Sequence, residues 1–463
     1  MKKIASPVVS SEYTQSSMLS FFGRLNYKYN EKYLLTASLR SDGSSTLAKG
    51  HKWGYFPSVA AAWRLSEESF LSGTRNWLSN LKFRASWGVS GNAAVDPYST
   101  LAALSTQNIY YYFTGGDVIG KVANSMANPN LKWETTSAFN YGIDFGIWNN
   151  RVSGSIDYFV SNTTDLLYFR TAPPSSVYPT IIDNVGETES QGVEIALNTS
   201  ILRSEDFSWE VNWSYTSFRD KVSKLSEGIE KYINGNDALI IGEPVSTFYN
   251  FEADGNWDVG EFAAYKSDWE ASHSGQTTSY IAGYGDPGTI KIVDRNDDGK
   301  IGDEDKVVYE RSPKHIIGMN NTFNYKDLSL SVQVYARLGG YIQYDYNAQL
   351  TYETSNWADL DYWTPSNTGA KFPSPGAVSS PHSNYGSSLL YEKADFFKIK
   401  DITLSYNLPK SIIGKIGLSQ LKVYGSMKNY FTFSGIDNYD PERGGAISFP
   451  LAKQLVFGLN LQF

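Results

Sequence analysis

The residues with the clearest chemical pattern lie in one acidic stretch, residues 294–305. Its first six residues run Asp, Arg, Asn, Asp, Asp, Gly, which matches the first half of an EF-hand calcium loop. Such a loop takes oxygen ligands from fixed positions, which here are Asp294, Asn296, Asp298, the carbonyl of Lys300, and Asp305. Because carboxylate, amide and carbonyl oxygens suit a hard cation, the stretch is predicted to bind Ca²⁺.

The same stretch has a second interpretation, as a solvated acidic turn without a metal. Asp305 stands where an EF-hand loop has Glu, and its shorter side chain makes two-oxygen coordination less certain. No helical pattern flanks the stretch, so it would be a bare loop. Mutual repulsion among its carboxylates favours the Ca²⁺ interpretation. The ion would stiffen a loop and would take no part in catalysis.

Aromatic residues in two polar segments form a second candidate site. They are Tyr110, Tyr111, Tyr112, Trp357, Tyr362 and Trp363. Aromatic faces can stack on sugar rings, bind a protein partner, or pack loops against each other. Packing is the expected role of any single ring, and a contact with a ligand or with a covering partner is expected of the clusters.

Arrangements that would support catalysis are missing from the sequence. The four histidines are far apart and fit no triad or metal motif, and cysteine is absent. Neighbouring acids such as Asp359 and Asp361 are expected to be solvated, not to form a glycosidase pair. A net charge of −8 without a basic patch argues against nucleic acid as a partner. We therefore expect neither an enzyme nor a further cofactor.

The elements that must position these residues are strands. Apolar and polar residues alternate most clearly at the C-terminus, where Leu455, Phe457, Leu459, Leu461 and Phe463 share one face. A tilted strand of about ten such residues crosses the hydrocarbon core of a membrane. Similar alternation occurs near residues 19–29, 33–39, 54–65, 81–87, 134–147, 152–160, 188–199, 209–216, 246–257, 315–325, 328–334, 397–407 and 420–432.

Alternation of this kind also occurs in soluble β-sandwiches, so further features must decide. Charged residues such as Arg40, Lys82 and Glu210 lie in mid-strand on the polar face, as a water-filled lumen allows. Aromatic residues such as Tyr29 and Tyr406 lie near strand ends, where a membrane interface would be. Both features favour an all-β fold, namely a transmembrane antiparallel β-barrel.

The connections between the expected strands come in two lengths. Tight turns occur at residues 30–32, 149–150 and 325–327, whereas residues 93–130, 258–312 and 339–392 form long polar connections. Short turns at one rim and long loops at the other are typical of outer-membrane barrels, with the long loops outside. Roughly fifteen strands are expected, in one unit that spans residues 1–463.

Several strings, taken together and in order, resemble the SusC/RagA family of TonB-dependent outer-membrane transporters. They are 40–45 (RSDGSS), 53–58 (WGYFPS), 62–66 (AWRLS), 81–88 (LKFRASWG) with 90–92 (SGN), 131–136 (LKWETT), 164–167 (TDLL) and 397–406 (FKIKDITLSY). The resemblance implies a 22-stranded barrel that encloses an N-terminal plug. It also implies import of oligosaccharides or peptides, driven by the TonB–ExbB–ExbD system and assisted by a SusD-like lipoprotein.

The sequence departs from that family at its N-terminal side. It has no evident signal peptide, TonB box or plug, and about fifteen of 22 strands are expected, so it is interpreted as the C-terminal part of a barrel. The final residue, Phe463, is the kind of terminal aromatic with which outer-membrane barrels commonly end. The expected location is the bacterial outer membrane, in contact with its lipid. The competing hypotheses are a surface glycan-binding β protein and a passive pore.

Overall fold

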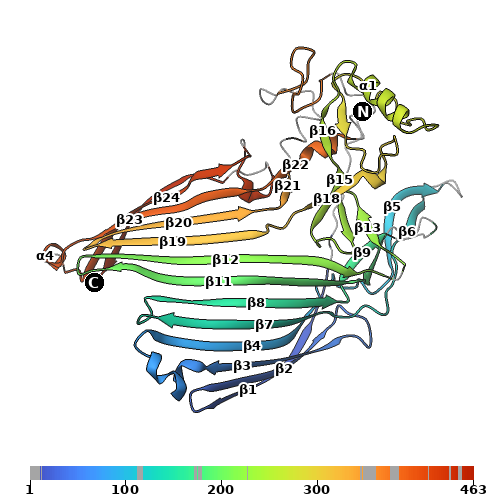
Figure 1. Cartoon of the computed structure of the whole chain (residues 1–463). Helices are drawn as coiled ribbons and strands as arrows, with labels where there is room; N and C mark the ends of the chain where they lie inside the picture. Colours follow the sequence, from blue (N-terminus) through green and yellow to red (C-terminus); the bar gives the residue numbers. More distant parts are fainter. Residues whose placement is uncertain are drawn as a thin grey trace, which may run out of the picture.

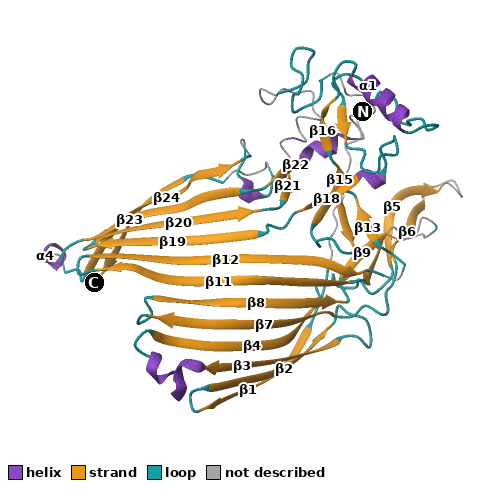
Figure 2. Ribbon diagram, in the orientation of Figure 1, coloured by secondary structure: helices purple, strands orange, loops and turns teal. Residues whose placement is uncertain are grey.

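The computed structural model is built almost entirely from strands that run side by side (Figures 1 and 2). It describes residues 11, 13–111, 118–171, 175, 180–226, 228–344, 347, 361–375, 385–414, 417–436, 439–446 and 451–463. Among the residues that the structure describes, no helix has the length and apolar character needed to cross a membrane.

One antiparallel sheet of thirteen strands forms the body of the molecule, and its strands follow one another in chain order. They are β1 (Met18–Tyr29), β2 (Tyr33–Ser44), β3 (Trp53–Arg64), β4 (Leu78–Asn92), β7 (Glu134–Ile147), β8 (Val152–Thr164), β11 (Glu187–Arg203), β12 (Phe207–Lys224), β19 (His315–Tyr325), β20 (Leu328–Leu338), β23 (Phe396–Asn407), β24 (Gln420–Ser434) and β25 (Gln454–Gln462). The sheet curves as a barrel wall does, but within the described residues it does not close, since β1 and β25 are its two edges (Figure 1). The expectation of a partial membrane barrel is confirmed.

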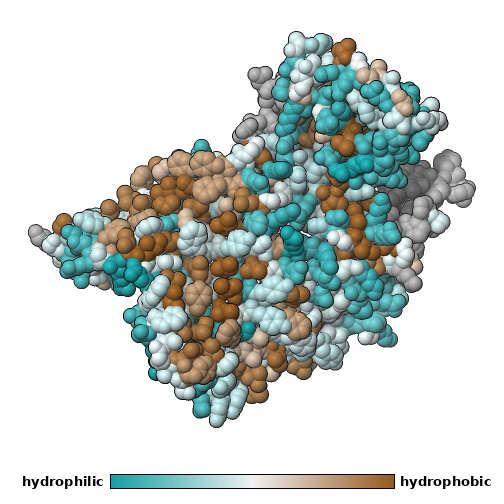
Figure 3. Space-filling view, viewed as in Figure 1, coloured by the Kyte–Doolittle hydropathy of each residue, from teal (hydrophilic) through white to brown (hydrophobic). Residues whose placement is uncertain are grey.

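The register places apolar side chains on one face of this sheet. Across five neighbouring strands, Leu35 pairs with Ala61, Ala61 with Ala85, Ala85 with Tyr141, and Tyr141 with Tyr158. Because strand residues alternate between faces, the residues between them point to the opposite, polar side. Apolar side chains gather over the strands and hydrophilic ones over the loop end (Figure 3). We call the apolar face of the sheet the outer face and its polar face the lumen face.

The tight turns lie where the sequence predicts them. Asn30 and Glu31 have φ values of 50° and 58°, and Asn149 and Asn150 have 57° and 59°. Two consecutive residues with positive φ form the turn whose twist matches that of a hairpin. All of these turns lie at one end of the sheet, opposite the long connections (Figure 2).

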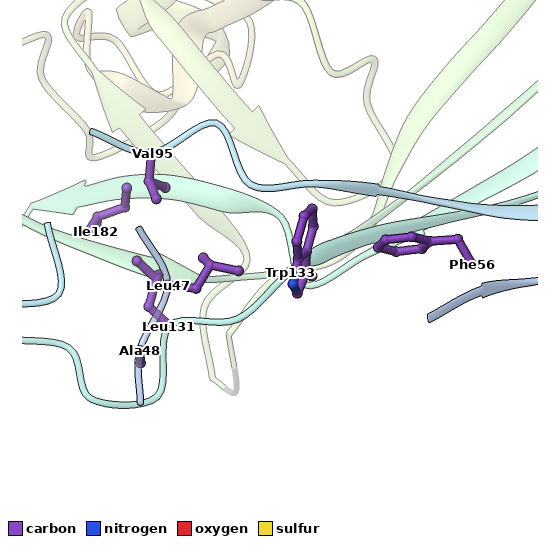
Figure 4. Packing of buried hydrophobic residues seen from close by; sticks show 7 residues of the cluster. All are labelled: Leu47, Ala48, Phe56, Val95, Leu131, Trp133 and Ile182. Atoms are coloured by element: carbon purple, nitrogen blue, oxygen red, sulfur yellow. The ribbon is translucent and has the colours of Figure 1, made fainter. Parts of the chain in front are cut away.

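The long connections fold into structure of their own instead of remaining loops. Residues 93–130 contain the hairpin of β5 (Ala103–Tyr111) and β6 (Val118–Ser125). A buried cluster at this end joins Phe56 of β3 to residues of several connections, among them Leu47, Leu131, Trp133 and Ile182 (Figure 4). A shorter hairpin joins β9 (Leu167–Thr171) to β10 (Thr180–Asn184). The loop end of the wall is thus held together by packing.

A larger lobe rises from the segment between β12 and β19. Its elements are β13 (Lys231–Asn234), β14 (Asp237–Ile240), β15 (Thr247–Phe251), β16 (Ala253–Asn256), α1 (Glu261–Ser272), β17 (Ile290–Ile292) and β18 (Lys306–Glu310). The prediction of a membrane strand near residues 246–257 is therefore wrong, because that segment forms β15 and β16 of the lobe. The lobe also contains the helix α1, whose twelve residues carry no clear apolar stripe and bury mainly Trp269.

Candidate functional site

Aromatic packing holds the lobe around the acidic stretch. Trp257 and Tyr284 are buried, and their rings pack edge-to-face against each other and against Phe262. Tyr385 joins the cluster from the 3₁₀ turn region before β22 (Tyr391–Lys393). The lobe therefore unites the connection of residues 258–312 with that of residues 339–392 through a shared core.

The acidic stretch adopts a tight loop in which its own backbone satisfies the carboxylates. Asp294 Oδ2 accepts a hydrogen bond from the amide of Gly299 at 3.0 Å, and its Oδ1 accepts one from Asp298 at 3.3 Å. Asp298 Oδ1 accepts one from the amide of Lys300. Burial raises the pKa of Asp294, and the nearby carboxylates of Asp305 and Asp298 raise it further. A cation would relieve this repulsion.

Asp305 closes the loop from its far end. It is almost fully buried, and its two oxygens accept from the amides of Arg295 at 2.8 Å and Gly302 at 2.7 Å. Within the described ranges, no three histidine, cysteine, aspartate or glutamate side chains converge in a way that could hold a metal. This includes the three aspartates of the predicted set, Asp294, Asp298 and Asp305, whose oxygens accept hydrogen bonds from backbone amides of the loop.

Trp269 of α1 determines the shape of this loop, and the sequence pattern did not reveal it. Its indole nitrogen donates to Asp297 Oδ1 at 2.6 Å, and its ring lies against Gly299. A Cβ at Gly299 would come within 2.8 Å of that ring, and the φ of +75° also requires glycine. His273 stacks on Trp269 with its Nε2 3.4 Å from Asp297. No periodic signal connects residues 269 and 299, so only folding brings them together.

The predicted aromatic contacts separate into two places. Tyr110 and Tyr111 lie in β5, which is not one of the elements of the lobe, and their side chains lie outside the described part of the structure. Trp363 is buried in the lobe, donates to Asp258 Oδ1 at 2.6 Å and lies against Gly288. Tyr362 is 42% exposed beside it. Tyr112 and Trp357 lie outside the described residues. Trp363 is thus a packing residue, and Tyr362 has a ring free for contact.

The lumen face carries a network of charges across three strands. Arg84 of β4 lies 2.8 Å from Asp144 of β7 and 3.0 Å from Asp157 of β8, and Lys82 lies 2.5 Å from Asp144. Lys82 pairs directly with Asp144 across the ladder, whereas Arg84 and Asp157 both pair with Gly142, which has no side chain to separate them. Paired charges let the wall remain polar without leaving isolated ions, as expected beside a water-filled passage.

A second ionic cluster attaches the last long loop to the lumen face. Lys398 of β23 is fully buried and lies 2.5 Å from Asp440 and 2.9 Å from Glu442. Lys400 contacts Glu442 at 2.5 Å. Asp440 and Glu442 belong to the loop between β24 and β25, so this loop folds back onto the wall. Neither lysine stood out in the sequence, because a register shift between Ile399 and Asp401, and not simple alternation, places Lys398 on the lumen face.

A sheet with one apolar and one polar face, short turns at one end and folded loops at the other defines an outer-membrane β-barrel. The family model described as "TonB dependent receptor-like, beta-barrel" matches residues 3–429. The chain belongs to this family of TonB-dependent receptor barrels and is a protein of the bacterial outer membrane. The resemblance to its SusC/RagA branch is confirmed by the relatives that follow.

TonB-dependent receptor P3 of Formosa agariphila is 31% identical over 98% of this chain and 46% of its own length. TonB-dependent receptor SusC of Bacteroides thetaiotaomicron is 31% identical over 97% of this chain and 44% of its own length. The solved RagAB peptide transporter matches with a TM-score of 0.77 and 25% identity, over 97% of this chain and 48% of that chain. This chain therefore spans about half the length of the relatives it matches.

Proposed function

We propose that the protein containing this chain imports a nutrient across the outer membrane, with energy supplied through TonB. The observation that carries the proposal is a sheet with a polar lumen face in a chain that matches a TonB-dependent receptor family over residues 3–429. The substrate class is an oligosaccharide or a peptide, and the solved relative RagAB is a peptide transporter. A SusD-like lipoprotein is the proposed partner at the loop end. The proposed role is transport and not catalysis.

The proposal is tested by uptake in the native cell. Cells lacking the gene, cells lacking TonB function and wild-type cells are supplied with labelled peptides and oligosaccharides of several lengths. Uptake of one class that disappears in both mutants supports the proposal. Uptake that needs the gene but not TonB would point to a passive pore. Binding at the cell surface without uptake would support the surface glycan-binding alternative.

Tyr362 and Trp363 allow a matched test of the aromatic contact. Tyr362→Ala is expected to lower uptake without lowering the amount of folded protein, because Tyr362 is 42% exposed whereas Trp363 is buried. Trp363→Ala is expected to loosen the lobe, since it removes a buried ring and the hydrogen bond to Asp258. Limited proteolysis reports the second effect. Unchanged uptake in Tyr362→Ala would remove Tyr362 from the proposed ligand or partner contact.

We also propose that the acidic loop holds Ca²⁺ through Asp294, Asn296, Asp298, the Lys300 carbonyl and Asp305. The support is the spacing of the oxygens, the required glycine at 299 and the raised pKa of Asp294. The ion would make the lobe rigid.

Calcium binding to the purified native protein tests this proposal. Asp298→Asn is expected to weaken binding about tenfold or more, because affinity follows ligand charge. The control is Glu304→Gln, an exposed acid of the same stretch outside the ligand set. Equal binding in both variants, or no binding in the wild type, would favour the metal-free acidic turn.

A further inference from the structure

The outer face contains an apolar groove near the short-turn end of the sheet. Its volume is about 720 Å³, and it runs across β1, β2, β3, β4, β7 and β8. Most of its lining side chains belong to the outer face by register, so the groove faces away from the lumen. Lipid is the medium that meets this face of a membrane barrel.

The groove exists because two small residues lie among large ones. Ala61 and Ala85 pair with each other at its floor, and Phe83, Tyr141 and Tyr158 stand beside them. Each of these three rings is more than two-fifths exposed. Because the large rings protrude and the two alanine methyl groups do not, a groove remains between the rings. A surface of side chains of equal size would have no such groove.

A rigid cluster marks the end of the groove at the rim. Glu68 accepts hydrogen bonds from the Tyr33 hydroxyl at 2.7 Å and from Trp63 Nε1 at 3.1 Å. Tyr33 and Trp63 are outer-face residues that also line the groove. The segment after β3, with 3₁₀ turns at Leu65–Glu67 and Ser69–Thr74, is therefore anchored on the outer face. Phe70 of this segment is 68% exposed, and an exposed aromatic ring near the rim is typical of the membrane interface of a barrel.

The rim beside the groove carries more cations than anions. Its cations are Lys28, Lys32, Arg64 and Arg75, and its acids are Glu31, Glu67 and Glu68. Lys28, Lys32 and Arg64 are paired with these acids. Arg75 is exposed and makes no ion pair with any residue in the described part of the chain. The excess charge at this rim is positive.

We propose that this groove holds one acyl chain of a phospholipid from the periplasmic leaflet, with the lipid phosphate near Arg75. The leaflet follows from the position of the groove at the short-turn rim, which is the periplasmic rim of such barrels. The occupant follows from continuity with the lipid interface and from the positive rim. The site is independent of the transported substrate, which passes along the opposite face.

The test is the phospholipid content of the native protein after prolonged detergent exchange. The wild type is expected to retain a single phospholipid, measured by native mass spectrometry and by lipid phosphorus. Ala61→Leu and Ala85→Leu fill the floor and are expected to abolish retention. Ala37→Leu is the matched control, because Ala37 lies on the same face, pairs with Val59 and does not line the groove. Heat-dependent migration in gels confirms that each variant is folded.

Retention in the wild type and in Ala37→Leu, with loss in both groove variants, supports the proposal. Arg75→Gln should then speed the loss of dipalmitoyl phosphatidylethanolamine added back in detergent. Equal retention in all variants would place the retained lipid outside the groove, and no retention in the wild type would mean that this face meets only exchanging lipid. Either result would overturn the proposal. Retention of lipopolysaccharide in place of phospholipid would overturn the assignment to the periplasmic leaflet.

Discussion

Lys398 illustrates how one side chain can determine the position of a loop. Its ammonium group is fully buried on the lumen face between Asp440 and Glu442. Removing one member of a buried ionic cluster leaves an uncompensated buried charge. This lowers the stability of the fold far more than the loss of an exposed ion pair does. The loop between β24 and β25 therefore depends on Lys398 more than on its half-exposed neighbour Lys400.

Lys398→Met is expected to destabilise the folded protein by about 3 kcal/mol, the cost of breaking a buried ion pair. Lys400→Met should cost about 1 kcal/mol or less, since its amine is partly solvated. Unfolding in denaturant measures both variants, and proteolysis in the loop of residues 435–453 should rise only in the first. Equal effects of the two substitutions would contradict this account of the cluster.

Glu68 provides a prediction about pH at the rim of the outer face. Hydrogen bonds from Tyr33, Lys32 and Trp63 lower its pKa from 4.5 to about 2. A carboxyl whose pKa is lower in the folded state stabilises the fold above the unfolded pKa, and this stabilisation is lost as the pH falls through the folded value. The denaturation midpoint of Glu68→Gln should therefore lie below that of the wild type at pH 7. The difference should shrink below pH 4.5 and disappear only below pH 2.

The control for this prediction is Glu67→Gln, which removes an exposed acid paired with Arg64. Its midpoint should stay close to that of the wild type at every pH. If the difference in denaturation midpoint between Glu68→Gln and the wild type does not change with pH, the packing of the Glu68 side chain, and not its negative charge, accounts for its role.

Each strand of the large sheet has one apolar and one polar face. An added charge should therefore affect the stability of the barrel differently on the two faces. In β20, Val332 pairs with Asn321 and Ile402 on the outer face, whereas the next residue, Gln333, is exposed on the lumen face. The alternation arises from strand geometry and not from any local motif.

Val332→Arg is expected to destabilise the barrel by about 2–4 kcal/mol, the cost of a cation on the lipid face at mid-depth. Gln333→Arg should change stability little, because water in the lumen solvates the guanidinium. Folding titrations in detergent or lipid vesicles compare the two. If Gln333→Arg proved the more damaging, the assignment of the two faces would be reversed.

The structure of the lobe is not evident from its local sequence pattern, whereas that of the strands in the large sheet is. Its segment near residues 246–257 alternates like a membrane strand, yet β15 pairs with β18 above the wall. The helix α1 carries no apolar stripe that would predict it, since only Trp269 is buried. Short segments of this kind take their structure from the packing around Trp257 and Tyr284 and not from their own pattern.

The large sheet has two free edges, at β1 and β25. Backbone groups at an open edge have no partner in hydrocarbon, where each costs several kcal/mol. A stable membrane barrel therefore needs strands that join these edges. Residues 1–463 expressed alone and exported should yield a band whose migration is the same before and after heating, whereas the native protein containing them should shift. A heat-dependent shift of residues 1–463 alone would show that the edges can pair with each other or with a second copy.

The sequence by itself determined the class of fold, the two faces and the turns, because a period of two and positive-φ turn residues are local properties of the chain. It also identified the acidic loop, whose spacing is contained within twelve residues. It predicted roughly fifteen strands where thirteen form the sheet, because alternation does not say which sheet a strand joins.

Only the tertiary structure decided which distant residues meet. It placed Trp269 on Gly299, buried Trp363 while leaving Tyr362 exposed, and brought Asp440 and Glu442 to Lys398. It also set Ala61 beside Ala85 among larger rings, which creates the groove. These contacts join residues far apart in sequence, and the physical reason they could not be predicted is that strand register and loop packing, not local spacing, bring them together.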